Sequence, residues 1–154
     1  TTSSAAPALA VRSATVDAPL QSYSESDMVE ARKNMELVGT RELPFLDQVR
    51  AYKILDLQRI GKTSPLEVQA FRLDKDTAIV TLPGEVFVEF GLMIKASSPF
   101  KNTLVMELTN NDIAYIPTKK AFDEGSYEIV NSRVTPGSGE KMANEAIRLL
   151  QELE

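Results

Sequence analysis

Residues 77–85 read TAIVTLPGE, and this stretch decides the fold. Thr77 to Leu82 is nearly all apolar or β-branched, which is typical of a central strand covered on both faces. Pro83 and Gly84 then turn the chain, because proline restricts the backbone and glycine permits a tight turn. The following apolar stripe predicts a helix that begins near Glu85: Val86, Phe87, Phe90 and Ile94.

The segments on either side alternate between strand and helix patterns. Strands are expected over residues 11–20, 66–70, 103–108, 113–116 and 127–134, with 103–108 buried like 77–82. Helices are expected over residues 24–38, 44–61, 119–124 and 139–153, the first of them opened by a capping box of Ser24 and Asp27. This order predicts an α/β fold, a mixed sheet with flanking helices, over residues 11–154. Residues 1–10 (TTSSAAPALA) are small and polar and predict a disordered linker or a cut end.

The composition excludes several classes of site. The chain has 154 residues, a net charge of −5, no cysteine and no histidine. Disulfides, thiolate nucleophiles, imidazole metal ligands and Ser-His dyads are therefore excluded. The acidic balance and the lack of a basic run argue against nucleic acid as a partner. No apolar run approaches the ~20 residues of a transmembrane segment.

Glu85 is the first candidate site residue. It follows a buried strand, and α/β proteins bind ligands at the carboxyl ends of their strands. A carboxylate there can ligate zinc through oxygen. The alternative is structural, since an acidic residue in a first helical turn stabilises the helix dipole.

Tyr115 and Tyr127 are the other two candidates. Tyr115 follows Glu85 by 115 − 85 = 30 residues, after a strand, a loop and a second strand that could return it to the same sheet edge. A tyrosine there can coordinate a metal or donate to a developing oxyanion. The alternative for both tyrosines is a packed ring with a solvated hydroxyl.

Three motifs resemble the neutral/alkaline non-lysosomal ceramidase family. They are Leu82-Pro83-Gly84-Glu85, the segment from Asn110 to Tyr115-Ile116-Pro117-Thr118, and the pair Tyr127-Glu128. The resemblance implies that residues 11–154 are the C-terminal part of a larger catalytic domain. It implies a zinc-dependent hydrolase of N-acyl sphingoid or similar lipid amides, with Glu85 and Tyr115 as metal ligands and Tyr127 assisting at the reacting carbonyl.

The resemblance also implies two histidine ligands, which an upstream segment of the same protein would supply. Without them, two donors of this chain should bind zinc weakly, and we expect the isolated chain to be inactive. Secretion, or a periplasmic or surface location, is implied by the resemblance alone. The second hypothesis is a non-catalytic α/β binding or interaction domain that keeps only the fold. Pro117 and the stretch Lys119-Lys120-Ala121-Phe122 depart from the family pattern and leave the substrate open.

A domain separated from a larger one exposes surface where its partner packed. We therefore expect an unpaired sheet edge and accessible residues near Val80 and Leu104.

Overall fold

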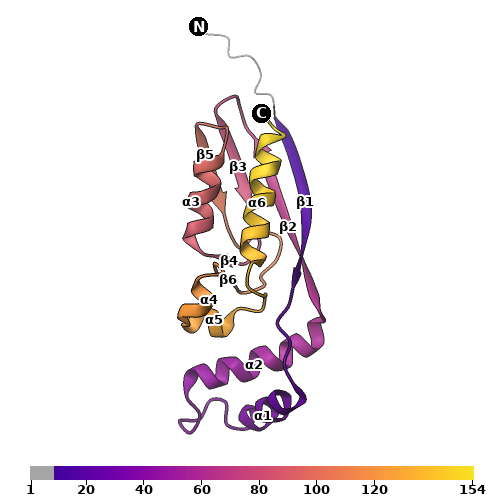
Figure 1. Ribbon diagram of the computed structural model, residues 1–154, viewed down its shortest axis with the longest axis vertical. Coiled ribbons are helices and arrows are strands. Elements are labelled where there is room, and N and C mark those ends of the chain that lie inside the picture. Colours follow the sequence, from indigo (N-terminus) through magenta and orange to yellow (C-terminus); the bar gives the residue numbers. More distant parts are fainter. Residues whose placement is uncertain (1–8) are drawn as a thin grey trace.

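The computed structural model describes residues 9–154. A four-stranded sheet has the order β1-β2-β3-β5 (Figure 1). The strands β1 (Ala10–Pro19), β2 (Thr63–Arg72) and β3 (Thr77–Thr81) pair antiparallel in turn, and β5 (Asn102–Met106) runs parallel to β3. The predicted α/β fold, a mixed sheet with flanking helices, is confirmed.

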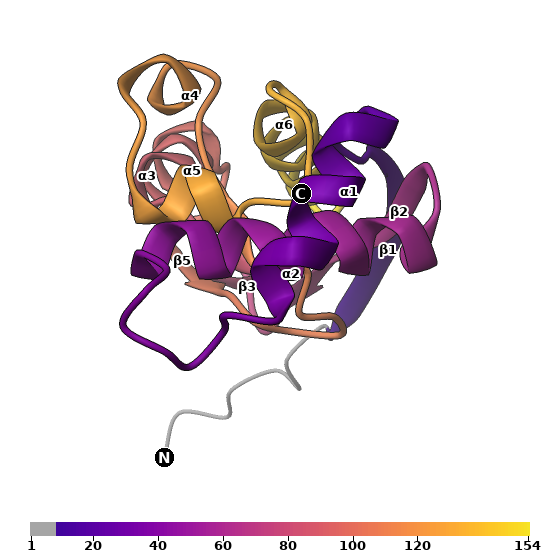
Figure 2. The same cartoon turned by 90° about the horizontal axis from the view of Figure 1, so that it is seen from below.

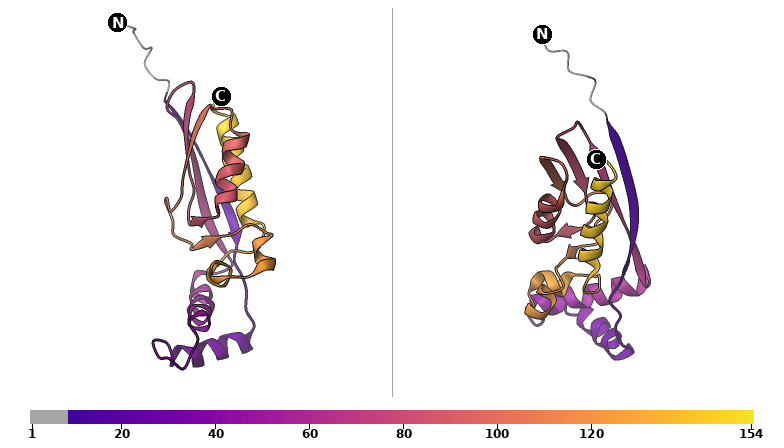
Figure 3. Two further views of the ribbon diagram at one scale, coloured as in Figure 1. Left: turned by 90° about the vertical axis from the view of Figure 1, so that its left-hand side faces the viewer. Right: turned by 45° about the horizontal axis from the view of Figure 1, so that its top comes forward.

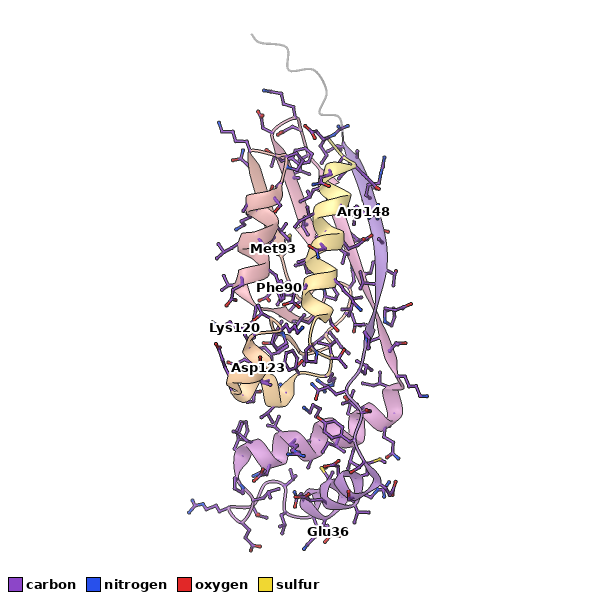
Figure 4. The ribbon with its side chains drawn as sticks, viewed as in Figure 1. Glu36, Phe90, Met93, Lys120, Asp123 and Arg148 are labelled. Atoms are coloured by element: carbon purple, nitrogen blue, oxygen red, sulfur yellow. The ribbon has the colours of Figure 1, made fainter. Side chains whose placement is uncertain are left out.

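Two long helices cover one face of this sheet. They are α3 (Val88–Ser97) and α6 (Ser138–Gln151), which lie side by side against the strands (Figures 2 and 3). The core beneath them contains alternate residues of β2 and β3 and the apolar stripe of α6: Leu66, Val68, Ala70, Ala78, Val80, Met142, Ala146, Leu149 and Leu150. Phe90 lies between the two helices (Figure 4), where its ring occupies the space beside Gly139. A side chain at Gly139 would collide with that ring, so the glycine permits the close helix contact.

The other two long helices form a hairpin at one end of the molecule (Figure 1). α1 (Glu25–Met35) begins with the predicted capping box, in which Ser24 and Asp27 bond each other's backbone amides. α2 (Phe45–Ile60) begins after Pro44. The hairpin has a small apolar cluster of its own, made by Ala31, Ala51 and Ile54.

Three expectations from the sequence are corrected. Residues 127–134 were expected to form a strand, but Tyr127–Asn131 is the short helix α5, because Ser126 and Glu128 accept helical bonds from Val130 and Ser132. The helix expected to begin near Glu85 begins at Val88. The strand expected to be buried over residues 103–108 is β5, an edge strand with alternating exposure.

The exposure expected near Val80 and Leu104 is half correct. Val80 is fully buried beneath the helices, because its side chain lies on the covered face of the sheet. Leu104 is 51% exposed on the opposite face, and β5 has a strand on one side only within the described residues.

The linker expected over residues 1–10 falls mostly on residues 1–8, which lie outside the described part of the chain. Ala10 already belongs to β1. Between residues 9 and 154, none of the helices combines the length and the apolar character needed to cross a membrane.

Candidate functional site

Glu85 and Tyr115 are brought together by a second, very small sheet. It consists of β4 (Glu85–Val86) and β6 (Tyr115–Ile116), which pair in parallel with Glu85 opposite Tyr115. Side chains of directly paired residues project to the same face of a sheet. The two candidate residues, 30 positions apart in the sequence, are therefore neighbours in space.

The turn at Gly84 positions this pair. Gly84 has a φ of 74°, and a Cβ atom added there would lie 2.7 Å from the carbonyl oxygen of Ala114. A glycine is required at this position for two reasons: the left-handed backbone, and the close approach of the loop. The backbone of residues 82–87 is consequently held directly against the segment that carries Tyr115.

Backbone hydrogen bonds fasten this turn to residues 107–116, which we call the clamping loop. Gly84 N donates to Asn111 O at 2.9 Å, and Glu85 N donates to Ala114 O at 3.0 Å. In the other direction, Leu108 N donates to Gly84 O at 3.0 Å. These bonds fix the register in which Glu85 meets Tyr115.

The clamping loop adopts an uncommon backbone conformation to make these bonds. Leu108, Asn110 and Ala114 all have positive φ values, of 53°, 65° and 63°. Such values cost roughly 1–2 kcal/mol each in residues other than glycine, so the surrounding contacts must hold them. The side chain of Asn110 donates to Gln69 Oε1 at 3.2 Å and thereby ties the loop to β2.

The electrostatics of the pair follow from its geometry. The pKa of Tyr115 is raised from 10.0 to about 12. The largest cause is the hydrogen bond with the Glu85 carboxylate, followed by burial and by the nearby charges of Glu85, Tyr127 and Glu128. A site surrounded by carboxylates and phenols favours a positive charge near the Tyr115 oxygen.

Tyr127 reaches the same place from α5. Its ring meets that of Tyr115 edge-on at a centroid distance of 5.7 Å. On its other side it stacks on Phe45, the first residue of α2, at 5.9 Å. The structure thus brings together all three candidates from the sequence, Glu85, Tyr115 and Tyr127, although their roles stay predictions.

Phe45 was not recognised from the sequence as part of this cluster. It is 65% exposed and comes from a distant helix, so neither periodicity nor spacing indicates its contact with Tyr127. Glu107 was also missed. Its carboxylate accepts a hydrogen bond from Val86 N at 2.6 Å and so supports the strand that carries Glu85.

The metal-ligand roles predicted for Glu85 and Tyr115 stay predictions. Within residues 9–154, no group of three or more histidine, cysteine, aspartate or glutamate side chains could hold a metal ion. The carboxylate of Glu85 and the phenol of Tyr115 are oxygen donors, and they belong to directly paired residues of β4 and β6. Two oxygen donors of this kind are compatible with a zinc ion but are fewer than the four ligands that zinc usually takes.

The comparisons with known proteins bear on the fold. No family model matches the chain, and no curated protein matches it at a significant level. The crystal structure of neutral ceramidase from Pseudomonas aeruginosa matches 94% of the chain with a TM-score of 0.61 and 17% identity. A ceramidase complexed with C2 matches 94% with a TM-score of 0.58 and 13% identity.

This chain spans less than a third of the length of either neighbour, 28% and 30% respectively. The resemblance to ceramidases indicated by the sequence motifs is thus confirmed at the level of fold, and the chain has the fold of a portion of a neutral ceramidase.

Proposed function

We propose that this chain is the C-terminal part of a zinc-dependent amide hydrolase related to neutral ceramidase. Its substrate would be an N-acyl sphingoid or a similar lipid amide. The observation that carries the proposal is the pairing of Glu85 with Tyr115 in the β4–β6 sheet. Structural similarity to two ceramidases over 94% of the chain supports it.

Each of the three site residues has a distinct role in this proposal. Glu85 and Tyr115 hold the zinc, together with two histidines from an upstream segment of the same protein. Zinc, when bound, supplies the Lewis acidity that amide hydrolysis needs at neutral pH. Binding requires loss of the proton that the Tyr115 hydroxyl shares with Glu85, so zinc affinity should rise with pH.

Tyr127 acts on the substrate. Its hydroxyl donates a hydrogen bond to the amide oxygen as negative charge develops there. The rings of Tyr115 and Phe45 hold the Tyr127 ring from two sides, which limits the orientations of the hydroxyl. This positioning lowers the entropic cost of reaching the reactive geometry.

The alternative function is a non-catalytic binding domain of the same fold. It is favoured by the absence of histidine from the chain and by a donor set of only two ligands. In that case the Glu85–Tyr115 hydrogen bond is a structural contact that fastens the Gly84 turn.

Zinc titration by calorimetry separates the two functions. The isolated chain should bind zinc with a dissociation constant weaker than about 1 μM, because two ligands leave the ion half coordinated. The complete gene product should bind zinc tightly and release fatty acid from an N-acyl sphingoid. A complete product that neither binds zinc tightly nor releases fatty acid would contradict the hydrolase and favour the non-catalytic binding domain.

Variants of the complete product assign the roles. Glu85→Gln and Tyr115→Phe should weaken zinc binding by at least about tenfold, and the exposed Glu89→Gln serves as the matched control. Tyr127→Phe should keep zinc affinity and lower kcat by about 100-fold. If Glu85→Gln binds zinc as well as Glu89→Gln does, Glu85 is not a ligand.

A further inference from the structure

The two edges of the main sheet differ in chemistry. β1 carries Arg12, Asp17 and Pro19, which are the charges and proline that natural proteins use to prevent pairing at an edge. β5 has the sequence NTLVM, with neither a charged residue nor a proline. Only the β1 edge is therefore protected against an added strand.

The backbone of β5 has groups available for pairing. Asn102 N donates to Asp76 O at 2.8 Å, and Met106 O accepts from Leu82 N at 2.8 Å, both on the β3 side. Successive residues of a strand direct their N–H and C=O groups to opposite edges. Thr103 and Val105 accordingly present theirs to the open edge.

Apolar side chains lie on both sides of that edge. Leu104 and Met106 are 51% and 49% exposed on the uncovered face of the sheet. On the covered side, a groove of about 280 Å³ between α3 and β5 is lined by Val88, Leu92 and Val105 among others. Val88 and Leu92 are themselves largely exposed.

Apolar residues extend across the uncovered face in one row, exposed at its two ends and half-buried between them. The strand register aligns four side chains, which we call the open-face row: Val11, Phe71, Ile79 and Leu104. No helix packs on this face (Figures 2 and 3) within residues 9–154. An apolar row of this length is typical of a sheet face that another layer covers.

We propose that a β-strand from another part of the same polypeptide pairs with β5, and that its neighbouring residues cover Leu104 and Met106. This inference rests on the proposed function, in which the chain is part of a longer enzyme. The occupant follows from the comparisons, because this fold is only 28–30% of each ceramidase chain that contains it.

The position of β5 links this interface to the site. Glu107 follows β5 directly, and its carboxylate accepts a hydrogen bond from the backbone N–H of Val86. Val86 is the residue after Glu85. A strand added at β5 would therefore end next to the β4–β6 sheet.

Amide hydrogen exchange tests the added strand. In the isolated chain, Thr103 and Val105 should exchange rapidly, as groups without a partner do. In the complete gene product they should exchange on the order of 100-fold more slowly. Equal rates in both proteins, or a gene product no longer than this chain, would overturn the proposal.

A matched pair of substitutions places the contact at β5. Leu104→Lys in the complete product should raise the exchange rates of Thr103 and Val105 by at least about tenfold. Val11→Lys should leave them unchanged, although Val11 lies in the same row and has the same exposure of 51%. Equal effects of the two variants would overturn the proposal.

A second copy of this chain is the other occupant that the edge could accept. In that case Thr103 and Val105 of the isolated chain would exchange more slowly as the protein concentration rises. This result would show self-association at β5 and contradict the proposal. Exchange at Thr103 and Val105 is measured with zinc removed from the sample, so it does not report on the metal. A protected β5 in a product that binds no zinc would refute the proposed function alone, and a zinc enzyme with an open β5 would refute this inference alone.

Discussion

The Gly84 turn and the helical hairpin both approach the Glu85–Tyr115 pair, but they are held in place differently. The turn is fastened to the clamping loop by backbone hydrogen bonds and leaves no room for a side chain at Gly84. The hairpin of α1 and α2 has a core of only three buried residues and meets the site through the exposed ring of Phe45.

The turn, rather than the hairpin, sets the geometry of the site. The energy of a close-packed backbone contact rises steeply when its atoms are displaced. The turn therefore fixes the positions of Glu85 and Tyr115. The hairpin borders a cavity of about 700 Å³ and contributes the Phe45 ring to the site. Because this ring stacks on Tyr127, the hairpin affects the site through the orientation of Tyr127. Four measurements test whether the turn and the hairpin differ in this way.

Gly84→Ala should have the largest effect. The new Cβ would lie 2.7 Å from the carbonyl oxygen of Ala114 in a left-handed backbone, and we expect a loss of about 3 kcal/mol or more in the free energy of unfolding. Gly39→Ala is the matched control, because Gly39 also has a positive φ of 84° but open space around it. Its loss should be about 1 kcal/mol by urea denaturation. Equal losses would show that the turn is not sterically constrained.

Lys53→Met should change how stability depends on pH. Burial first, and the charges of Arg50 and Arg133 next, lower the pKa of Lys53 from 10.5 to about 8 in the folded chain. Between these pH values the unfolded chain binds more protons, so the stability of the native protein rises with pH. We expect a gain of about 2 kcal/mol across this window, measured by urea denaturation.

The Lys53→Met variant should lose this gain and have a flat profile from pH 8 to 10.5. Lys33→Met, at an exposed position of α1, is the control and should keep it. A rising profile in Lys53→Met would show that the titrating group is not Lys53.

The contact between Phe45 and Tyr127 should contribute less. A double-mutant cycle with Phe45→Ala and Tyr127→Ala should give a coupling energy of about 1 kcal/mol, as expected for stacked rings. Tyr52→Ala, another exposed aromatic of α2, should show no coupling with Tyr127→Ala. Zero coupling for Phe45 would mean that the hairpin does not orient Tyr127.

Glu85→Gln should have the smallest effect on stability but a clear effect on titration. The pKa of Tyr115, about 12 in the native chain, should fall toward its ordinary value of 10.0 when the carboxylate is removed. Phenolate absorbance measures this against the three other tyrosines. Glu128→Gln is the control and should lower the pKa of Tyr115 less, because its charge is the last of the causes.

The sign of the accompanying stability change follows from the raised pKa. The hydrogen bond stabilises the native chain fully below pH 10 and is lost as the pH rises toward 12. In Glu85→Gln this alkaline loss should disappear. An unchanged tyrosine titration would mean that Glu85 and Tyr115 do not share a hydrogen bond.

Most of the fold could be predicted from local patterns. The apolar and β-branched run at residues 77–82 identified β3, and the capping box at Ser24 identified the start of α1, because both depend on neighbours in the sequence. The helix α5 was predicted as a strand, because a run of five residues carries too little periodicity to separate the two. The exposure of β5 was also missed, since an apolar strand reads the same at the centre and at the edge of a sheet.

The sequence specifies which groups this chain offers for chemistry: carboxylates and phenols, without imidazole or thiol, and a glycine that permits one tight turn. Tertiary structure decided which of these groups meet. Glu85 and Tyr115 become neighbours through the register of β4 with β6, and Tyr127 joins them through its edge-on ring contact with Tyr115. The spacing of residues along a chain does not predict such tertiary contacts. They depend on how distant segments pack and on which backbone hydrogen bonds the packing allows.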